Sequence, residues 1–177
     1  GTNLIGGQPV SLQNMLEVAQ ICKENGILSI LDASLLQDNA YFMKTREEMC
    51  KNLSVKDIMH KLGDAMDLIY FSARKLGFSR GGAIISHNED LILKMKEYIP
   101  LYEGFLTYGG MEVRSMEAMA VGLRESLDME YISQGPLFIE YLVNELDKYG
   151  VPVIKPAGGL GAHVNAGAIL PHIPQNQ

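Results

Sequence analysis

An aspartate and a lysine follow two neighbouring apolar segments, at positions where side chains of an α/β protein can do chemistry. Asp32 ends the apolar run 27–32, and Lys75 follows the run 67–72 by three residues. Because ligands of open parallel sheets bind at the carboxyl ends of the strands, we expect both side chains at one edge of the sheet. A lysine that forms a Schiff base and a carboxylate that keeps a pyridine nitrogen protonated suit pyridoxal phosphate chemistry. A nearby serine hydroxyl would hold the phosphate.

The same two residues also have ordinary explanations. An aspartate directly after a strand often caps a helix or closes a turn. A lysine in a loop is usually a solvated surface charge. The spacing of Asp32 and Lys75 alone therefore indicates an α/β domain and leaves the chemistry open.

Apolar periodicity and capping residues predict the elements that hold these side chains. Ser11, Ser54 and Asn88 each precede a helical pattern and are expected N-caps. Short apolar runs predict buried strands at 27–32, 67–72 and 82–86, with short late strands at 151–154 and 162–166. Helices are expected at 12–25, 38–52, 54–61, 89–98, 111–123 and 136–149. This alternation predicts an α/β domain with a mostly parallel sheet flanked by helices.

Length and composition exclude several classes of protein. The chain has 177 residues, of which 47% are hydrophobic and 20% are charged, as in one sizeable globular domain or the larger part of one. A net charge of -6 argues against a nucleic-acid-binding surface, and no apolar run is long enough to span a bilayer. Two cysteines cannot build a disulfide framework, and the four histidines lack metal-ligand spacing. We therefore expect a cytoplasmic protein without a side-chain metal site.

Several distinctive motifs follow one another along almost the whole chain. They are Asn3–Ser11, Asp32–Ser34, Asp38–Phe42, Ser72–Lys75 with Gly81–Gly82, Glu103–Gly110, Met119–Leu123 and Pro171–Pro174. In order and spacing this series resembles the aromatic amino acid β-eliminating lyases, the family of tryptophanase and tyrosine phenol-lyase.

The resemblance implies a fold, a reaction and an assembly. The fold is the pyridoxal phosphate-dependent, aspartate aminotransferase-like fold type I. The reaction is β-elimination of tryptophan or tyrosine to indole or phenol, pyruvate and ammonia. The chain matches only the middle of the family sequence, so we expect a piece of a longer enzyme that works as a homo-oligomer, a dimer or a tetramer. Residues 1–125 are predicted to be the central part of the large cofactor-binding domain, and 126–177 a connecting helix and the start of the small-domain region.

Positions that match the family motifs take over the family roles. Lys75 matches the lysine that forms the Schiff base and moves the Cα proton, and Asp32 matches the carboxylate beside the pyridinium nitrogen. Asn3 matches the amide that binds the phenolic oxygen of the cofactor. Ser72 matches the phosphate-binding serine. The resemblance therefore assigns four of the cofactor contacts to this chain.

Other positions depart from the family pattern or have a second explanation. Arg74 replaces a cofactor-binding lysine and keeps its charge but not its geometry. Phe105 matches an apolar residue near the departing aromatic ring, although ordinary packing explains it equally well. Leu35 and Leu160 stand where the family has an arginine and a histidine. The loop 75–81 is one residue shorter than in the family, which puts in doubt the potassium ion that the family binds partly through carbonyls of this loop.

Two alternatives to an aromatic amino acid lyase remain open. The first is a divergent pyridoxal phosphate lyase with another substrate, such as cysteine, which Leu35 favours. The second is a non-catalytic relative that serves as a scaffold. The presence of both Lys75 and Asp32 argues against the scaffold.

Overall fold

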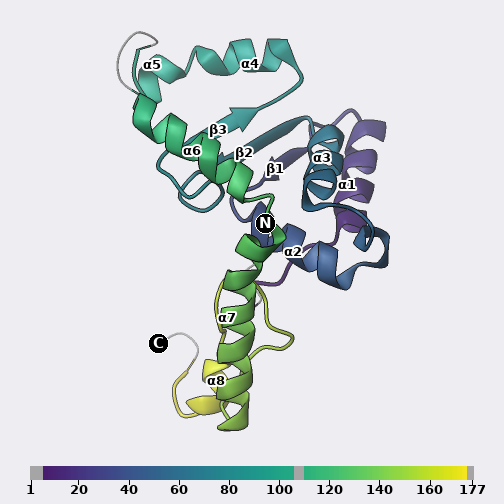
Figure 1. Cartoon of the computed structure of the whole chain (residues 1–177), viewed down its shortest axis with the longest axis vertical. Helices are drawn as coiled ribbons and strands as arrows, with labels where there is room; N and C mark the ends of the chain where they lie inside the picture. The colour runs from purple at the N-terminus through teal and green to yellow at the C-terminus, as the bar shows by residue number, and fades with distance from the viewer. Residues whose placement is uncertain (1–5, 106–109, 175–177) are drawn as a thin grey trace.

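A small sheet with helices packed around it forms the upper body of the molecule, and one long helix leads away from that body (Figure 1). The computed structural model describes residues 6–105 and 110–174. No helix within these ranges is long and apolar enough to cross a membrane. The described elements, in chain order, are α1 (Leu12–Glu24), β1 (Ile30–Asp32), α2 (Leu36–Arg46), η1 (Glu48–Cys50), α3 (Val55–Ala65), β2 (Leu68–Ser72), β3 (Gly82–Ile85), α4 (Glu89–Lys96), α5 (Ile99–Tyr102), α6 (Val113–Glu125), α7 (Met129–Lys148) and α8 (Ala166–Ile169).

Three helices begin at the N-caps that the sequence predicts. The side chain of Ser11 accepts a hydrogen bond from a backbone N–H of α1, and Asn88 does the same for α4. Ser54 and Asp57 form a reciprocal capping box at the start of α3. Each cap supplies an acceptor to backbone N–H groups that have no partner inside the helix.

Strands β1 and β2 lie parallel, and their register places Asp32 opposite Tyr70. A side-chain clamp fixes the amino-terminal end of this pair. The carboxylate of Asp67 accepts hydrogen bonds from the backbone N–H and the hydroxyl of Ser29, at 2.7 and 2.8 Å. The backbone N–H of Asp67 donates in return to the Ser29 hydroxyl at 3.0 Å. These hydrogen bonds lower the pKa of Asp67, so its carboxylate stays ionised and the clamp stays closed at neutral pH.

The third strand corrects the sequence prediction. We expected a mostly parallel sheet, but β3 is antiparallel to β2, with Ser72 opposite Gly82. The connection between them runs only from residue 73 to residue 81. A parallel crossover needs a dozen or more residues, whereas an antiparallel pair can be joined by a short turn. The sheet therefore has one parallel and one antiparallel pair, in the order β1-β2-β3.

Other boundaries also differ from the prediction. The helix expected at 38–52 ends at Arg46 and is followed by the short 3-10 helix η1. Helix α7 begins at Met129 rather than at Pro136, because Asp128 caps it and the proline is accommodated inside. The two late strands reduce to one isolated bridge between Val153 and Val164. The predicted division after residue 125 falls at the end of α6 and stays a prediction.

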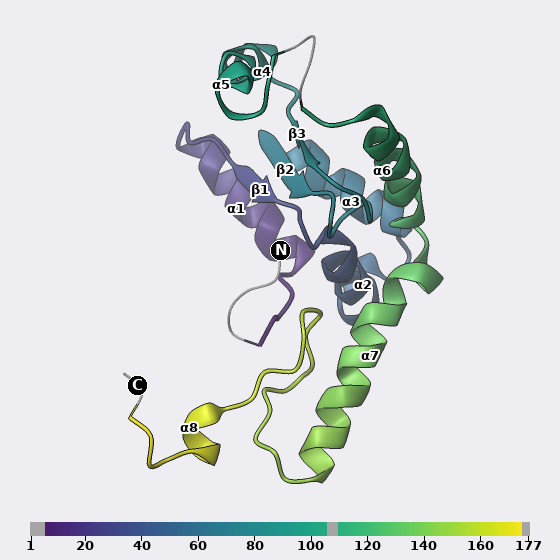
Figure 2. The same cartoon turned by 90° about the vertical axis from the view of Figure 1, so that its left-hand side faces the viewer.

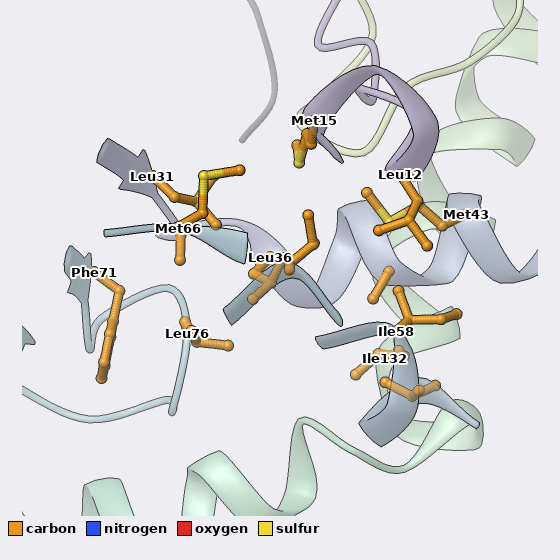
Figure 3. Packing of buried hydrophobic residues seen from close by; sticks show 14 of the residues in the cluster. Leu12, Met15, Leu31, Leu36, Met43, Ile58, Met66, Phe71, Leu76 and Ile132 are labelled. Atoms are coloured by element: carbon orange, nitrogen blue, oxygen red, sulfur yellow. The ribbon is translucent and has the colours of Figure 1, made fainter. Parts of the chain in front are cut away.

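The hydrophobic core lies on one face of the sheet, between the strands and helices α1, α2 and α3 (Figure 3). Leu31 and Phe71 reach into it from β1 and β2. The helices contribute side chains that are completely buried, namely Leu12, Ile58 and Leu62. Side chains of one strand alternate between the two faces of a sheet, so this core sets which strand residues point away from it.

The opposite face of the sheet carries apolar and polar side chains together. Ile30 and Ile84 are 59% and 56% exposed there, so these strands are not buried on both faces as the sequence predicts. The register places Asp32, Tyr70 and Ile84 in one row across the three strands. We call this surface the open face. It is the face on which the candidate site lies.

Helix α7 packs against α2, and a partly buried carboxyl group, that of Asp38, lies at this junction. A Cβ atom on Gly159 would lie 3.0 Å from the Cβ of Asp38, and one on Gly135 would lie 3.9 Å from its Oδ1. The chain returns from the far end of α7 towards α2 at this point (Figure 2). Burial raises the pKa of Asp38 to about 6, because the ionised form loses its hydration.

The substitution Asp38→Asn is expected to stabilise the protein at pH 8. In the unfolded chain an aspartate ionises near pH 4, while Asp38 of the folded protein keeps its proton to about pH 6. Stability therefore falls as the pH rises through this window and is constant above it. Urea unfolding should show Asp38→Asn more stable than wild type by about 1–3 kcal/mol at pH 8 and equal to it near pH 4. Asp64→Asn, at an exposed position of α3, is the control, and a gain independent of pH would contradict the assignment.

Candidate active site

The carboxyl ends of β1 and β2 bring the two predicted reactive segments side by side. The N–H of Ala33 donates to the carbonyl of Tyr70 at 2.8 Å, which extends the parallel ladder past Asp32. One step further, the N–H of Ser72 donates to the hydroxyl of Ser34 at 3.2 Å. Neighbouring strands lie about 4.8 Å apart. The turn after Asp32 and the turn that contains Lys75 are therefore in direct contact.

The carboxylate of Asp32 is held in its ionised form. Partial burial pushes its pKa upwards, but the hydroxyl and the backbone N–H of Ser34, together with the hydroxyl of Tyr70, outweigh burial and lower the pKa. The Ser34 N–H donates to Oδ1 at 3.0 Å. The negative charge of Asp32 raises the pKa of Tyr70 in turn. An ionised carboxylate at this strand end is the group that a protonated ring nitrogen requires.

Lys75 lies in a tight turn that the rest of the protein holds in place. Its N–H donates to the carbonyl of Ser72 at 3.1 Å, and its own carbonyl accepts from the side-chain amide of Gln37 at 3.0 Å. Both Arg74 and Lys75 are exposed, and neither forms an ion pair with another residue in the described part of the chain. The turn therefore presents two cationic side chains to solvent, on the segment that contacts the turn after Asp32.

Helix α6 supports this turn through a close backbone contact. A Cβ atom on Gly122 would lie 2.0 Å from the carbonyl oxygen of Gly77, so only glycine allows α6 to approach so closely. The hydroxyl of Ser79 donates to the carbonyl of Ser115 at 2.9 Å on the same helix. The motif Met119–Leu123 therefore has a structural reason, which is to seat the loop that follows Lys75.

A cavity of about 690 Å³ lies between the sheet and helices α4 and α5. Tyr70 lines it from the open face, and Tyr98, Tyr102 and Met111 are among the side chains that complete its wall. Its size and mixed apolar and aromatic lining are typical of small-molecule pockets. Tyr70, which also interacts with Asp32, links this cavity to the candidate site, whereas Asp32, Ser72 and Lys75 are not among its lining residues.

The remaining predicted residues have different outcomes. Asn3 lies outside the described residues, so its predicted role stays a prediction. Phe105 is described, is 57% exposed and is not among the residues that line the cavity. Leu35 occupies the N-cap position of α2 and makes no side-chain capping bond. Within residues 6–105 and 110–174, the side chains of His, Cys, Asp and Glu form no group of three that could hold a metal ion. A potassium site would be built from backbone carbonyls, so the absence of such a side-chain group does not test it.

Sequence reasoning missed three residues of the site. Tyr70 shares a strand with Ser72, two positions earlier, so the period of two already places both on one face. Ser34 stood in a motif but without a role, although it contacts both Asp32 and the Ser72 N–H. Gln37 had no sequence signal, because its contact with Lys75 depends on how α2 packs under the turn.

The residues present fit pyridoxal phosphate. An exposed primary amine and an ionised carboxylate lie at the ends of adjacent strands, and Ser72, the last residue of β2, has a hydroxyl without a hydrogen bond to another described residue. These groups match the three functions that the cofactor needs from a protein, namely a covalent link, a partner for the ring nitrogen and a phosphate donor.

Comparisons with known proteins agree with this chemistry. A family model described as beta-eliminating lyase matches residues 1–171. Tyrosine phenol-lyase of Fusobacterium nucleatum is 42% identical over 99% of this chain and 38% of its own length. Tryptophanase of Hyphomonas neptunium is 39% identical over 97% of this chain and 38% of its own length. The chain thus spans about two fifths of these relatives.

A likeness to a solved structure supports the fold. A crystal structure from Listeria monocytogenes, assigned provisionally as an L-allo-threonine aldolase, superposes with a TM-score of 0.59 over 87% of this chain and 38% of that chain. The sequence identity is 19%. At this level the likeness shows a shared α/β fold and says nothing about the substrate.

The substitution Tyr70→Phe is expected to raise the pKa of Asp32 towards the usual aspartate value. It removes one of the hydroxyl groups that stabilise the ionised carboxylate and leaves the aromatic ring in place. The stability that the ionised Asp32 contributes is present above the usual aspartate pKa and is lost as the pH falls through the lower, folded value. A carbon-detected NMR titration of the Asp32 carboxyl group measures the shift. Tyr149→Phe, at an exposed helix end, is the control, and an unchanged Asp32 pKa in Tyr70→Phe would contradict the interaction.

Proposed function

Since the chain belongs to the beta-eliminating lyase family, we propose that it carries the cofactor-binding lysine and carboxylate of a pyridoxal phosphate-dependent lyase. The observation that supports this most directly is the contact between the strand-end turns that hold Asp32 and Lys75. The proposed reaction is removal of the side chain of an aromatic amino acid, tyrosine or tryptophan, with release of phenol or indole, pyruvate and ammonia.

Each residue has a defined task in this proposal. The amine of Lys75 would hold the cofactor covalently and, as a free amine, would take the proton from the substrate Cα. The carboxylate of Asp32 accepts a hydrogen bond from the ring nitrogen and keeps that nitrogen protonated. The hydroxyl of Ser72 and the guanidinium of Arg74 hold the phosphate. When bound, the cofactor supplies an electron sink for the charge that develops at Cα.

A lyase with another substrate is the second candidate. Leu35 stands where the resemblance implies an arginine, and it offers no hydrogen bond to the site. We therefore propose to assay tyrosine, tryptophan and cysteine in parallel. Release of phenol, indole or sulfide identifies the side chain that leaves.

The assembly and location belong to the same proposal. We propose a homo-oligomer, because helix α7 exposes Leu137, Phe138 and Tyr141 over its middle turns. We also propose a cytoplasmic setting, since neither Cys22 nor Cys50 is paired in a disulfide. Residues 1–125 would then contribute to the cofactor-binding domain and 126–177 to the connection with the small domain.

Replacement of Lys75 tests the covalent link. Protein mixed with pyridoxal phosphate and reduced with borohydride should carry a pyridoxyl group on Lys75, which peptide mass spectrometry locates. The Lys75→Ala variant is expected to lose both this label and the lyase activity, because it removes the amine of the segment that contacts the turn after Asp32. The exposed Lys94→Ala variant on α4 serves as the control. Activity near the wild-type level in Lys75→Ala would overturn the assignment.

Replacement of Asp32 tests the partner of the ring nitrogen. Asp32→Ala should lower turnover roughly 10²- to 10⁴-fold, because a ring without its nitrogen proton accepts electrons poorly. The label on Lys75 should persist, since Asp32 does not form the covalent link. Kinetic measurements beside Asp64→Ala, an exposed control, give the comparison. Turnover within a fewfold of wild type would mean that another group holds this proton.

A further inference from the structure

Gln37 is a buried amide whose orientation is fixed by the backbone of Lys75. Its side chain is only 5% exposed, and it is the second residue of α2. Its Nε2 donates to the carbonyl oxygen of Lys75 at 3.0 Å. Because a carbonyl oxygen only accepts hydrogen bonds, the nitrogen and not the oxygen of the amide must face Lys75.

The other half of this amide has no partner. The Oε1 atom of Gln37 is buried without a hydrogen bond to any residue in the described ranges. A buried acceptor without a partner is unfavourable, and an apolar side chain of similar length would avoid that cost. Packing alone therefore does not explain an amide at position 37. What the amide adds is the bond to the lysine.

With this bond, both backbone polar groups of Lys75 are hydrogen-bonded. The N–H of Lys75 is bound to the carbonyl of Ser72, and its carbonyl is bound by Gln37. The side chain of Lys75 makes no hydrogen bond or ion pair with another described residue, so other residues hold Lys75 in place through its backbone.

The same short segment that carries Asp32 therefore holds the lysine turn at two points. The hydroxyl of Ser34 accepts a hydrogen bond from the N–H of Ser72. Three residues further along each segment, the side chain of Gln37 donates to the carbonyl of Lys75. The carboxylate and the backbone of the lysine are thus fixed relative to each other by one connection, residues 32–37. A rigid support of this kind is what precise placement of a reactive group requires.

We propose that Gln37 is a positioning residue, which fixes the backbone of Lys75 so that its amine meets pyridoxal phosphate beside Asp32. The inference rests on the proposed function, and Gln37 acts through the lysine without touching the cofactor. The variant Gln37→Met keeps the length of the side chain and removes the donor. Gln37→Glu keeps the shape and, when ionised, cannot donate to the carbonyl. Gln134→Met, on the exposed side of α7, is the matched control.

The first measurement needs no cofactor. Hydrogen exchange of the peptide that covers residues 72–79 is compared in wild type and the three variants. Loss of one hydrogen bond should speed exchange there roughly three- to tenfold in Gln37→Met and Gln37→Glu, with α1 and α3 unchanged. Unchanged exchange in the turn would overturn the proposal. Unfolding of both Gln37 variants would also overturn it, because Gln37 would then serve general stability.

The second measurement reports on the lysine. The rate at which Lys75 acquires the borohydride-trapped pyridoxyl label should fall severalfold in both Gln37 variants and stay at the wild-type value in Gln134→Met. An unchanged labelling rate would overturn the proposal. If wild-type Lys75 were not labelled at all, the proposed function would fail, and Gln37 could position nothing for it. If wild-type labelling were normal and only the effect of Gln37 were missing, the proposed function would stand.

Discussion

The parallel register between β1 and β2 is the constraint on which the rest of the structure depends. Side chains outside the strands continue this register at both ends, with Ser29 bound to Asp67 at one end and Ser34 bound to Ser72 at the other. A slip of β1 by one residue would exchange the two faces of that strand. It would move Leu31 out of the core and Asp32 into it. The clamps therefore secure the core and the candidate site together.

One face of the sheet stabilises the fold, and the other carries the candidate site. One face is covered by α1, α2 and α3, whose completely buried side chains supply the apolar area that stabilises the fold. The other face keeps Asp32 and Tyr70 accessible, next to exposed isoleucines. A polar group placed on the covered face would lose its hydration and need a buried partner. The alternation along β1 and β2 is thus what allows an ionised carboxylate to sit one residue away from the core.

Features that depend on residues close together in the sequence, such as helix caps and strand ends, were predicted. Features that depend on how distant segments pack were missed. Ser11, Ser54 and Asn88 were predicted as caps because capping depends on residues three positions apart. The ends of β1 and β2 followed from apolar runs. The antiparallel direction of β3 depends on a short connection, and the position of Gln37 depends on the packing of α2 under a turn. The length of that connection can be read from the sequence, between the runs 67–72 and 82–86, whereas the contact of Gln37 leaves no periodic pattern. The start of α7 was misplaced because Pro136 is a strong local signal that Asp128 and the helix interior override.

The charge of Asp32 does not depend on an arginine at position 35. Neutral donors stabilise the carboxylate, namely the backbone N–H and hydroxyl of Ser34 and the hydroxyl of Tyr70, and they lower its pKa in spite of partial burial. A neutral donor leaves the net negative charge of the group intact, whereas a guanidinium partner would cancel much of it. Leu35 therefore removes a hydrogen-bonding group from the site without removing the ionised carboxylate. The negative charge of Asp32 therefore remains at the carboxyl end of β1 without a guanidinium at position 35.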